Sequence, residues 1–224
     1  MNESQDDDVA LEPAAMLALM QNQQRSIERQ VNGFVPVITL GWALTWLLGF
    51  GALWLIDGLR PAFALPVEVA VWFFVVCVLA TGALSAILGI RSGRGLRGNT
   101  AAAFTGTVYG ITWGVGATAL GVLGAAFRAQ GMTAELANFY YPSAYVLFAG
   151  IMYMIAGGIW RTVPSLIAGA WLVMVAAAAP FFGYPHHYLF IAVTAGGAFL
   201  ALSAIGFAEL RRVRNAANGG TSRG

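Results

Sequence analysis

Six stretches of the sequence are almost entirely apolar and long enough to cross a lipid bilayer. A helix needs about 20 apolar residues to span the hydrocarbon core, with a usual range of about 17–25. Most prolines fall between these stretches, where a helix can end at little cost. The pattern therefore predicts an all-α, polytopic membrane bundle. The six predicted spans cover residues 36–56, 69–90, 102–127, 143–160, 165–181 and 188–207.

Composition excludes a soluble globular domain. Of the 224 residues, 58% are hydrophobic and only 10% are charged, and the mean hydropathy is +0.71, whereas soluble domains carry about 25% charged residues. The formal net charge of +2 is too small to indicate a nucleic-acid partner. The single cysteine, Cys77, lies in an apolar run and is expected to be a small core residue.

Arginine placement predicts the orientation. All twelve basic residues are arginines, and short loops rich in arginine stay in the cytoplasm. With six spans, both termini share one side with the loops after the second and fourth spans, and only Arg60 and Arg128 fall on the other side. We therefore expect a multi-pass protein of a bacterial inner membrane with both termini in the cytoplasm.

Residues 1–33 are predicted to be a cytoplasmic segment with an amphipathic helix. The helix is expected to begin near Asp8 or Glu12, with Pro13 in its first turn, and to end at Gly33. Its apolar seam could lie on lipid or on the bundle, or it could bind a second copy or a cytoplasmic protein. Residues 34–208 would form the transmembrane domain and residues 209–224 a disordered cytoplasmic tail. The seam residues are Leu17, Met20, Gln24, Ile27 and Val31.

Small residues recur every four positions in several spans. In lipid, such residues let helix backbones approach closely, so we expect these ladders to pack helices within the chain, with a dimerisation face as the alternative. Short sequence echoes, such as Thr45-Trp46 and Thr112-Trp113, are compatible with three hairpins descended from one unit. The ladders are Gly106, Gly110 and Gly114 in the third span, Gly41, Thr45 and Gly49 in the first, Thr81, Ser85 and Gly89 in the second, and Thr194, Ala198 and Gly206 in the sixth.

A candidate ligand site combines aromatic and hydroxyl side chains of the first and third spans. They would line a cavity for a small solute between these spans. The alternative is core packing, with each hydroxyl bonded to the preceding helical turn. The candidate ligand-binding residues are Thr45, Trp46, Tyr109, Thr112 and Trp113.

Reactive chemistry is scarce, and no cofactor is expected. The predicted spans contain essentially no ionisable residue, which disfavours a proton-coupled pump, and no catalytic constellation favours an enzyme. Carboxylates and imidazoles do occur in the predicted outer loops and could in principle bind a metal, but we expect them to be solvated loop ends. They are Asp57, Glu68, Glu135, His186 and His187.

The chain resembles uncharacterised six-span membrane proteins of high-GC bacteria that are often labelled transporter or permease. The resemblance rests on the helix of residues 21–30, the Gly-Trp-Ala of residues 41–43 and the loop entrance at residues 89–93. Its topology is also similar to that of small acid-resistance membrane proteins with three hairpins. Neither resemblance supplies functional residues.

These observations favour a non-enzymatic bundle, permease-like or sensing, that handles a small, mostly apolar or zwitterionic solute. The alternative is a membrane anchor or assembly subunit that recruits a cytoplasmic partner through its N-terminal helix.

Overall fold

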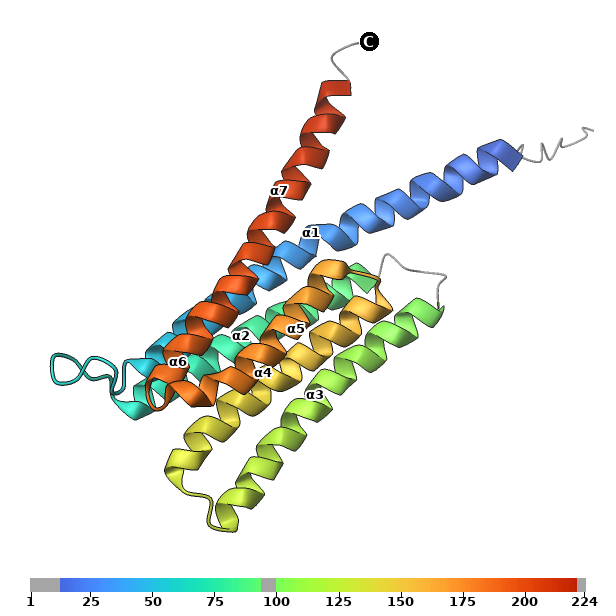
Figure 1. Cartoon of the computed structure of the whole chain (residues 1–224). Helices are drawn as coiled ribbons and strands as arrows, with labels where there is room; N and C mark the ends of the chain where they lie inside the picture. The colour runs from blue at the N-terminus through green and yellow to red at the C-terminus, as the bar shows by residue number, and fades with distance from the viewer. Residues whose placement is uncertain (1–12, 94–99, 221–224) are drawn as a thin grey trace, which may run out of the picture.

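The computed structural model describes residues 13–93 and 100–220, and this part of the chain is a bundle of long helices (Figure 1). Two of the membrane-spanning segments are not continuous α-helices. The fifth consists of an α-helix and a 3₁₀ turn, and the sixth contains a short π-helix. The elements are α1 (Pro13–Trp54), α2 (Val67–Gly93), α3 (Thr100–Ala129), α4 (Ala134–Ile159), α5 (Val163–Ala178), η2 (Ala179–Phe182), α6 (His186–Ile191), η3 (Ala192–Gly196) and α7 (Gly197–Gly220).

Six helical segments in the described residues are long and apolar enough to cross a membrane, which confirms the predicted polytopic architecture. Each overlaps one predicted span. The largest difference is the fourth, which begins earlier because Thr133 caps the helix by accepting a hydrogen bond from the backbone N–H of Leu136. The segments are Gly33–Trp54, Val67–Arg91, Ala103–Ala129, Ala134–Ile159, Val163–Phe182 and His186–Arg212.

The predicted helix ends at both termini of the chain need correction. α1 does not end at Gly33 but runs unbroken from Pro13 to Trp54. A glycine costs a helix only about 1 kcal/mol, less than ending one helix and nucleating another. The tail predicted to be disordered is helical as far as Gly220. The side chains of the seam residues 17–31 lie outside the described part, so the predicted partner face stays a prediction.

Two prolines expected at helix ends lie inside helices. Pro36 is inside α1 and Pro142 is inside α4, and both are buried. Transmembrane helices tolerate proline where other groups bond the backbone carbonyls that it leaves without a donor. At Pro142 a neighbouring segment compensates, because Nε2 of His187 lies 3.0 Å from the carbonyl oxygen of Asn138.

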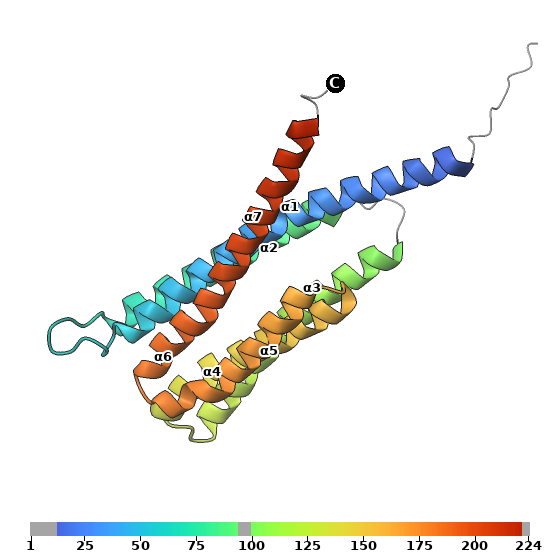
Figure 2. The same ribbon diagram turned by 45° about the horizontal axis from the view of Figure 1, so that its top comes forward.

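The helices form two layers of three (Figure 2). In one layer α1 is the middle helix, packed against α2 and against the sixth span, which comprises α6, η3 and α7. In the other layer α4 is the middle helix, packed against α3 and α5. The layers meet where α5 touches η3 and α7. Among the described residues, α1–α2 and α4–α5 are the most closely packed hairpins. The three-hairpin repeat with which the sequence echoes are compatible stays a prediction.

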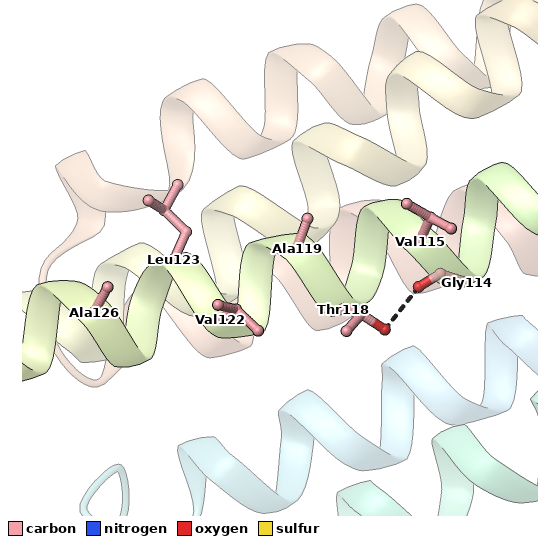
Figure 3. Close-up of a pocket in the computed structure, with 7 residues that line it drawn as sticks. All are labelled: Gly114, Val115, Thr118, Ala119, Val122, Leu123 and Ala126. Carbon is pink, nitrogen blue, oxygen red and sulfur yellow. Dashed lines mark hydrogen bonds between the residues drawn. The ribbon is translucent and has the colours of Figure 1, made fainter.

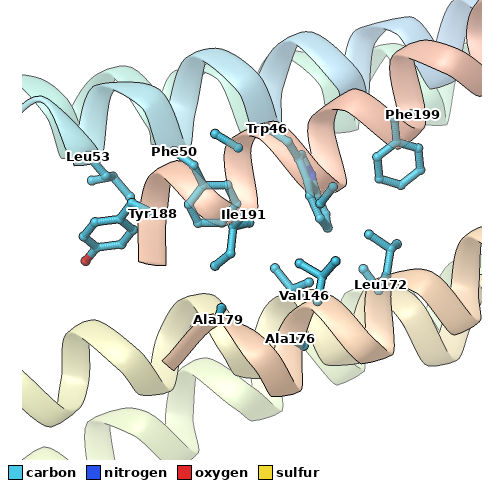
Figure 4. Packing of buried hydrophobic residues seen from close by; sticks show 14 of the residues in the cluster. Trp46, Phe50, Leu53, Val146, Leu172, Ala176, Ala179, Tyr188, Ile191 and Phe199 are labelled. Carbon is cyan, nitrogen blue, oxygen red and sulfur yellow. The ribbon is translucent and has the colours of Figure 1, made fainter. Parts of the chain in front are cut away.

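One apolar cluster contains residues of both layers (Figure 4). Trp46 and Phe50 enter it from α1, Ile191 and Phe199 from the sixth span, and Leu172 from α5, and all five are almost completely buried. Dense contact of this kind is a main source of helix attraction in lipid, where the hydrophobic effect is weak. The cluster therefore joins the two layers.

The hairpin of α4 and α5 relies on glycine. A Cβ atom on Gly169 would lie 2.5 Å from the backbone nitrogen of Met154, and one on Gly157 would lie 2.7 Å from the backbone nitrogen of Leu166. Real Cβ atoms do not come so close to backbone, so these positions require glycine.

The second and third spans are the least enclosed. Only 11% of the most apolar window of α2 and 6% of that of α3 are buried, whereas the other four spans reach 33–39%. The start of α1 and the end of α7 extend beyond the bundle at the same end (Figure 1), as six crossings require. This agrees with the predicted relative placement of the termini. Which side of the membrane they occupy stays a prediction.

Candidate functional site

The candidate residues on α1 point to different neighbours. The hydroxyl of Thr45 lies 2.7 Å from that of Thr81 on α2 and 3.3 Å from the carbonyl oxygen of Cys77. The indole of Trp46 instead packs edge-on against Phe199, with ring centroids 5.2 Å apart. Thr45 therefore belongs to the α1–α2 contact, and Trp46 belongs to the core between the layers.

Thr45 is part of a polar seam, which comprises Thr45, Thr81, Trp42 and Ser85. The Trp42 indole N–H donates to the Ser85 hydroxyl over 3.1 Å, and the Ser85 hydroxyl donates to the carbonyl of Thr81 over 2.8 Å. Gly41 lets α2 approach, because a Cβ there would already be 3.2 Å from the Thr81 methyl group. The hydroxyl groups of the polar seam all bond to protein atoms. The seam is therefore suited to holding α1 and α2 together.

Two of the three candidate residues on α3, Tyr109 and Trp113, face α4. The Tyr109 hydroxyl donates to the carbonyl of Met152 over 3.2 Å, and the Trp113 ring packs against Phe148 at 5.3 Å. Thr112 is exposed, and its hydroxyl bonds back to the carbonyl of Val108 over 2.8 Å. Thr112 therefore makes the hydroxyl bond to the preceding helical turn that the core-packing alternative predicts.

Three of the five candidates are nevertheless linked by one aromatic chain across both layers. The chain passes from α1 through the sixth span to α4 and then to α3. Successive ring centroids are 5.2, 5.1, 6.4, 6.3 and 4.8 Å apart, and the planes lie at steep angles, as aromatic pairs prefer. The chain is Trp46, Phe199, Tyr153, Trp113, Tyr109 and Trp160.

Phe199 is not among the candidate ligand-binding residues predicted from the sequence. This residue is only 2% exposed and connects Trp46 to Tyr153. Its span carries few polar residues near it, so neither hydroxyl groups nor spacing drew attention to it. Phe199 and Tyr153 therefore connect Trp46 on α1 to Trp113 and Tyr109 on α3. Thr45 and Thr112 lie outside this connection.

The glycine ladder of α3 does not pack within the described chain, which overturns the expectation for this ladder. Cβ atoms on Gly106, Gly110 or Gly114 would meet nothing within 4 Å. An open groove of about 650 Å³ follows the helix from Gly114 to Ala126, and the Thr118 side chain points toward the layer that contains α1 and α2 (Figure 3). In contrast, Gly41 and Gly49 of the first-span ladder do pack on α2, against Thr81 and Phe74.

A polar group occupies the end of the bundle opposite the chain termini. Arg60 forms an ion pair with Asp57 at 2.7 Å, and the hydroxyl of Tyr184 donates a hydrogen bond to the same carboxylate. Partial burial, the hydrogen bond and the negative charge of Asp57 together raise the pKa of Tyr184 to about 12, while Arg60 opposes the rise. These groups tie the α1–α2 loop to the turn before α6.

The candidate metal ligands are dispersed among other roles. Glu68, Glu135 and His186 are exposed, Asp57 is engaged by Arg60 and Tyr184, and His187 is buried with both ring nitrogens beside backbone carbonyls. Within residues 13–93 and 100–220, no three His, Cys, Asp or Glu side chains are grouped closely enough to bind a metal ion.

The architecture defines a polytopic α-helical membrane protein. Comparison with known proteins adds no family, because no family model, curated protein or solved structure matches the chain. Functional inference therefore depends on the contacts described above.

Proposed function

We propose that this chain is a non-enzymatic membrane protein that binds a small, mostly apolar or zwitterionic solute between its two layers, and that it transports or senses this solute. One observation carries the proposal. The aromatic chain joins the layers across the bundle, and rings from both layers offer apolar faces with the tyrosine hydroxyls of Tyr109 and Tyr153 among them. Apolar walls with a few polar groups are typical of small-molecule sites.

The lack of charged side chains in the aromatic chain narrows the class of solute that it could bind. The residues of the aromatic chain carry no ionised group, and ionisable side chains at membrane depth usually mark ion and proton pathways. The proposed solute is therefore uncharged overall, and its movement would follow its own gradient.

Solute-dependent thermal stability of the purified full-length protein tests the proposal. A solute at about 100 times its dissociation constant stabilises the folded protein by about 2.7 kcal/mol. We expect at least one member of a panel of apolar and zwitterionic solutes to raise the melting temperature, and Trp113→Ala to abolish this rise.

Trp72→Ala on α2 is the matched control, because Trp72 is 68% exposed and lies outside the aromatic chain. Each variant is compared with and without solute, so a lower baseline stability of Trp113→Ala does not affect the readout. Failure of the whole panel to stabilise the protein, or an equal loss of the rise in Trp72→Ala, would count against the proposal.

The alternative role, a membrane anchor or assembly subunit, is supported by a different observation. α1 begins at Pro13, well before its membrane segment at Gly33, and projects from the bundle as a continuous helix (Figure 1). Such a rigid arm suits recruitment of a cytoplasmic partner. Deletion of residues 2–30 would remove the arm, and an unchanged set of co-purifying proteins after this deletion would remove the basis for the role.

A further inference from the structure

His187 is a buried histidine that touches both layers of the bundle. Its side chain is 0% exposed. It lies in the first turn of the sixth span in one layer, and its ring lies against Phe139 of α4 in the other layer, with centroids 4.7 Å apart. The ring therefore sits at the junction of α4, α6 and the turn that precedes α6.

Both ring nitrogens of His187 face oxygen atoms that can only accept hydrogen bonds. Nδ1 lies 3.2 Å from the carbonyl oxygen of Gly183, and Nε2 lies 3.0 Å from the carbonyl oxygen of Asn138. A neutral imidazole has one N–H and one lone pair, whereas the protonated ring has two N–H donors. Only the protonated ring can donate to both carbonyls at once.

The carbonyl of Asn138 needs this donor. In an α-helix it would accept the backbone N–H of residue 142, four positions later, but residue 142 is Pro142, which has no N–H. His187 Nε2 thus occupies the position of the missing helical donor. The carbonyl of Gly183, by contrast, already accepts the backbone N–H of His187 over 2.9 Å.

This difference predicts which bond survives when the ring loses a proton. The neutral ring should keep Nε2–H on Asn138, which has no helical donor, and turn the lone pair of Nδ1 toward Gly183. The turn around Gly183 then loses a hydrogen bond and gains a lone-pair repulsion. Tyr184, the next residue in this turn, is the one that holds Asp57.

The two carbonyls are the acceptors for the N–H groups of the ring, because none of the charged and titratable groups described near it bonds to it. On the turn, the Tyr184 ring lies 6.1 Å from that of His187 and directs its hydroxyl to Asp57, which is paired with Arg60. Within the described residues His187 has no ion pair of its own. The other titratable groups on α4 and α6 are Glu135, Tyr140, Tyr141, Tyr145 and Tyr153 on α4 and His186 and Tyr188 beside His187.

We propose that His187 is a proton-operated latch, in which the protonated ring bridges the carbonyls of Gly183 and Asn138 and fixes the turn before α6 against α4. Loss of the proton releases the turn while the bond to α4 persists. The latch goes beyond the proposed solute site and does not depend on it, because all of its groups lie at the end of the bundle opposite the chain termini.

Nitrogen NMR of the histidine ring tests the latch directly. The chain has only two histidines, so the full-length His186→Gln protein, labelled with ¹⁵N-histidine and placed in lipid bilayers, reports His187 alone. Spectra are recorded from about pH 5 to about pH 9, the range in which histidine titrates. We expect two N–H signals at low pH and, after titration, a neutral ring that keeps the proton on Nε2.

Two results would overturn the latch. One is a neutral ring throughout the pH range, and the other is a neutral ring with its proton on Nδ1. A second measurement is the melting temperature against pH. It should change as the ring titrates, both in the natural protein and in His186→Gln. His187→Gln should lose this pH dependence, because a glutamine amide can donate to Asn138 but offers no second nitrogen to Gly183.

Discussion

Tyr184, in the turn before α6, donates its hydroxyl hydrogen to the carboxylate of Asp57, which follows α1. The two residues are 127 positions apart in the chain, so this bond fastens the loop between the first two spans to the turn between the last two. It also makes the ionisation of Tyr184 a reporter of this end of the bundle.

Tyr184 should therefore ionise at a higher pH than an unperturbed tyrosine. Burial, the hydrogen bond and the charge of Asp57 raise its pKa to about 12, above the value of about 10 for an unperturbed tyrosine. The raised pKa contributes stability that is fully present below about pH 10 and is lost as the pH rises through about 12. Tyrosinate absorbance should show a transition near this pH that Tyr184→Phe removes.

Two variants near Tyr184 should shift this transition in opposite directions. Asp57→Asn removes the carboxylate, so the transition should move toward lower pH. Arg60→Gln removes the charge that opposes the rise, so the transition should move toward higher pH. Equal behaviour of the two variants would show that Asp57 does not control the ionisation of Tyr184.

The hydroxyl pair of Thr45 and Thr81 should stabilise the contact between α1 and α2. Hydrogen bonds between transmembrane helices contribute about 0.6 kcal/mol on average and up to about 1.7 kcal/mol. A double-mutant cycle of Thr45→Val and Thr81→Val, measured by unfolding in denaturing detergent, should give a coupling free energy in this range. Thr112→Val is the control and should have little effect, because its exposed hydroxyl bonds only within α3. Additive effects of the first two variants would contradict a direct bond.

Glycine substitutions should separate packed from open helix faces. In Gly169→Ala, the new methyl group would lie 2.6 Å from the carbonyl oxygen of Gly150, and backbone cannot move aside cheaply. Overpacking typically costs about 1–3 kcal/mol, and we expect a loss at the upper end of this range. Gly110→Ala faces open space and should be neutral or stabilising by up to about 1 kcal/mol. The melting temperatures of the two variants provide the measurement, and a large loss in Gly110→Ala would show that the α3 ladder is packed against another chain.

The spans could be predicted from the sequence because length and apolarity alone decide which segments suit a bilayer. The packing partners could not. Gly110 and Gly169 are both glycines in apolar helices, yet only Gly169 has a helix backbone beside it, and this depends on which faces α4 and α5 turn toward each other. Small residues permit close packing without specifying where it occurs.

The candidate site was predictable in composition but not in geometry. Thr45 and Trp46 are neighbours in the sequence, and successive helical residues point about 100° apart, so one faces α2 while the other faces the core. The role of Phe199 depends on the sixth span lying between α1 and α4. His187 needed Pro142 and the turn at Gly183 to acquire its partners, and one of these partners, the carbonyl of Asn138, is 49 positions away in the chain.

The orientation of the bundle makes a final prediction. Both helical ends project on one side (Figure 1), and because ten of the twelve arginines belong to that side in a six-span chain, it should be cytoplasmic. With Cys77→Ser as the background, a membrane-impermeant maleimide applied to intact cells should label Ala62→Cys in the exposed loop after α1. Ser4→Cys and Ser222→Cys should react only in inverted vesicles. Labelling of Ala62→Cys only in inverted vesicles would reverse the orientation, whereas labelling of Ser4→Cys and Ser222→Cys from opposite sides would contradict six crossings.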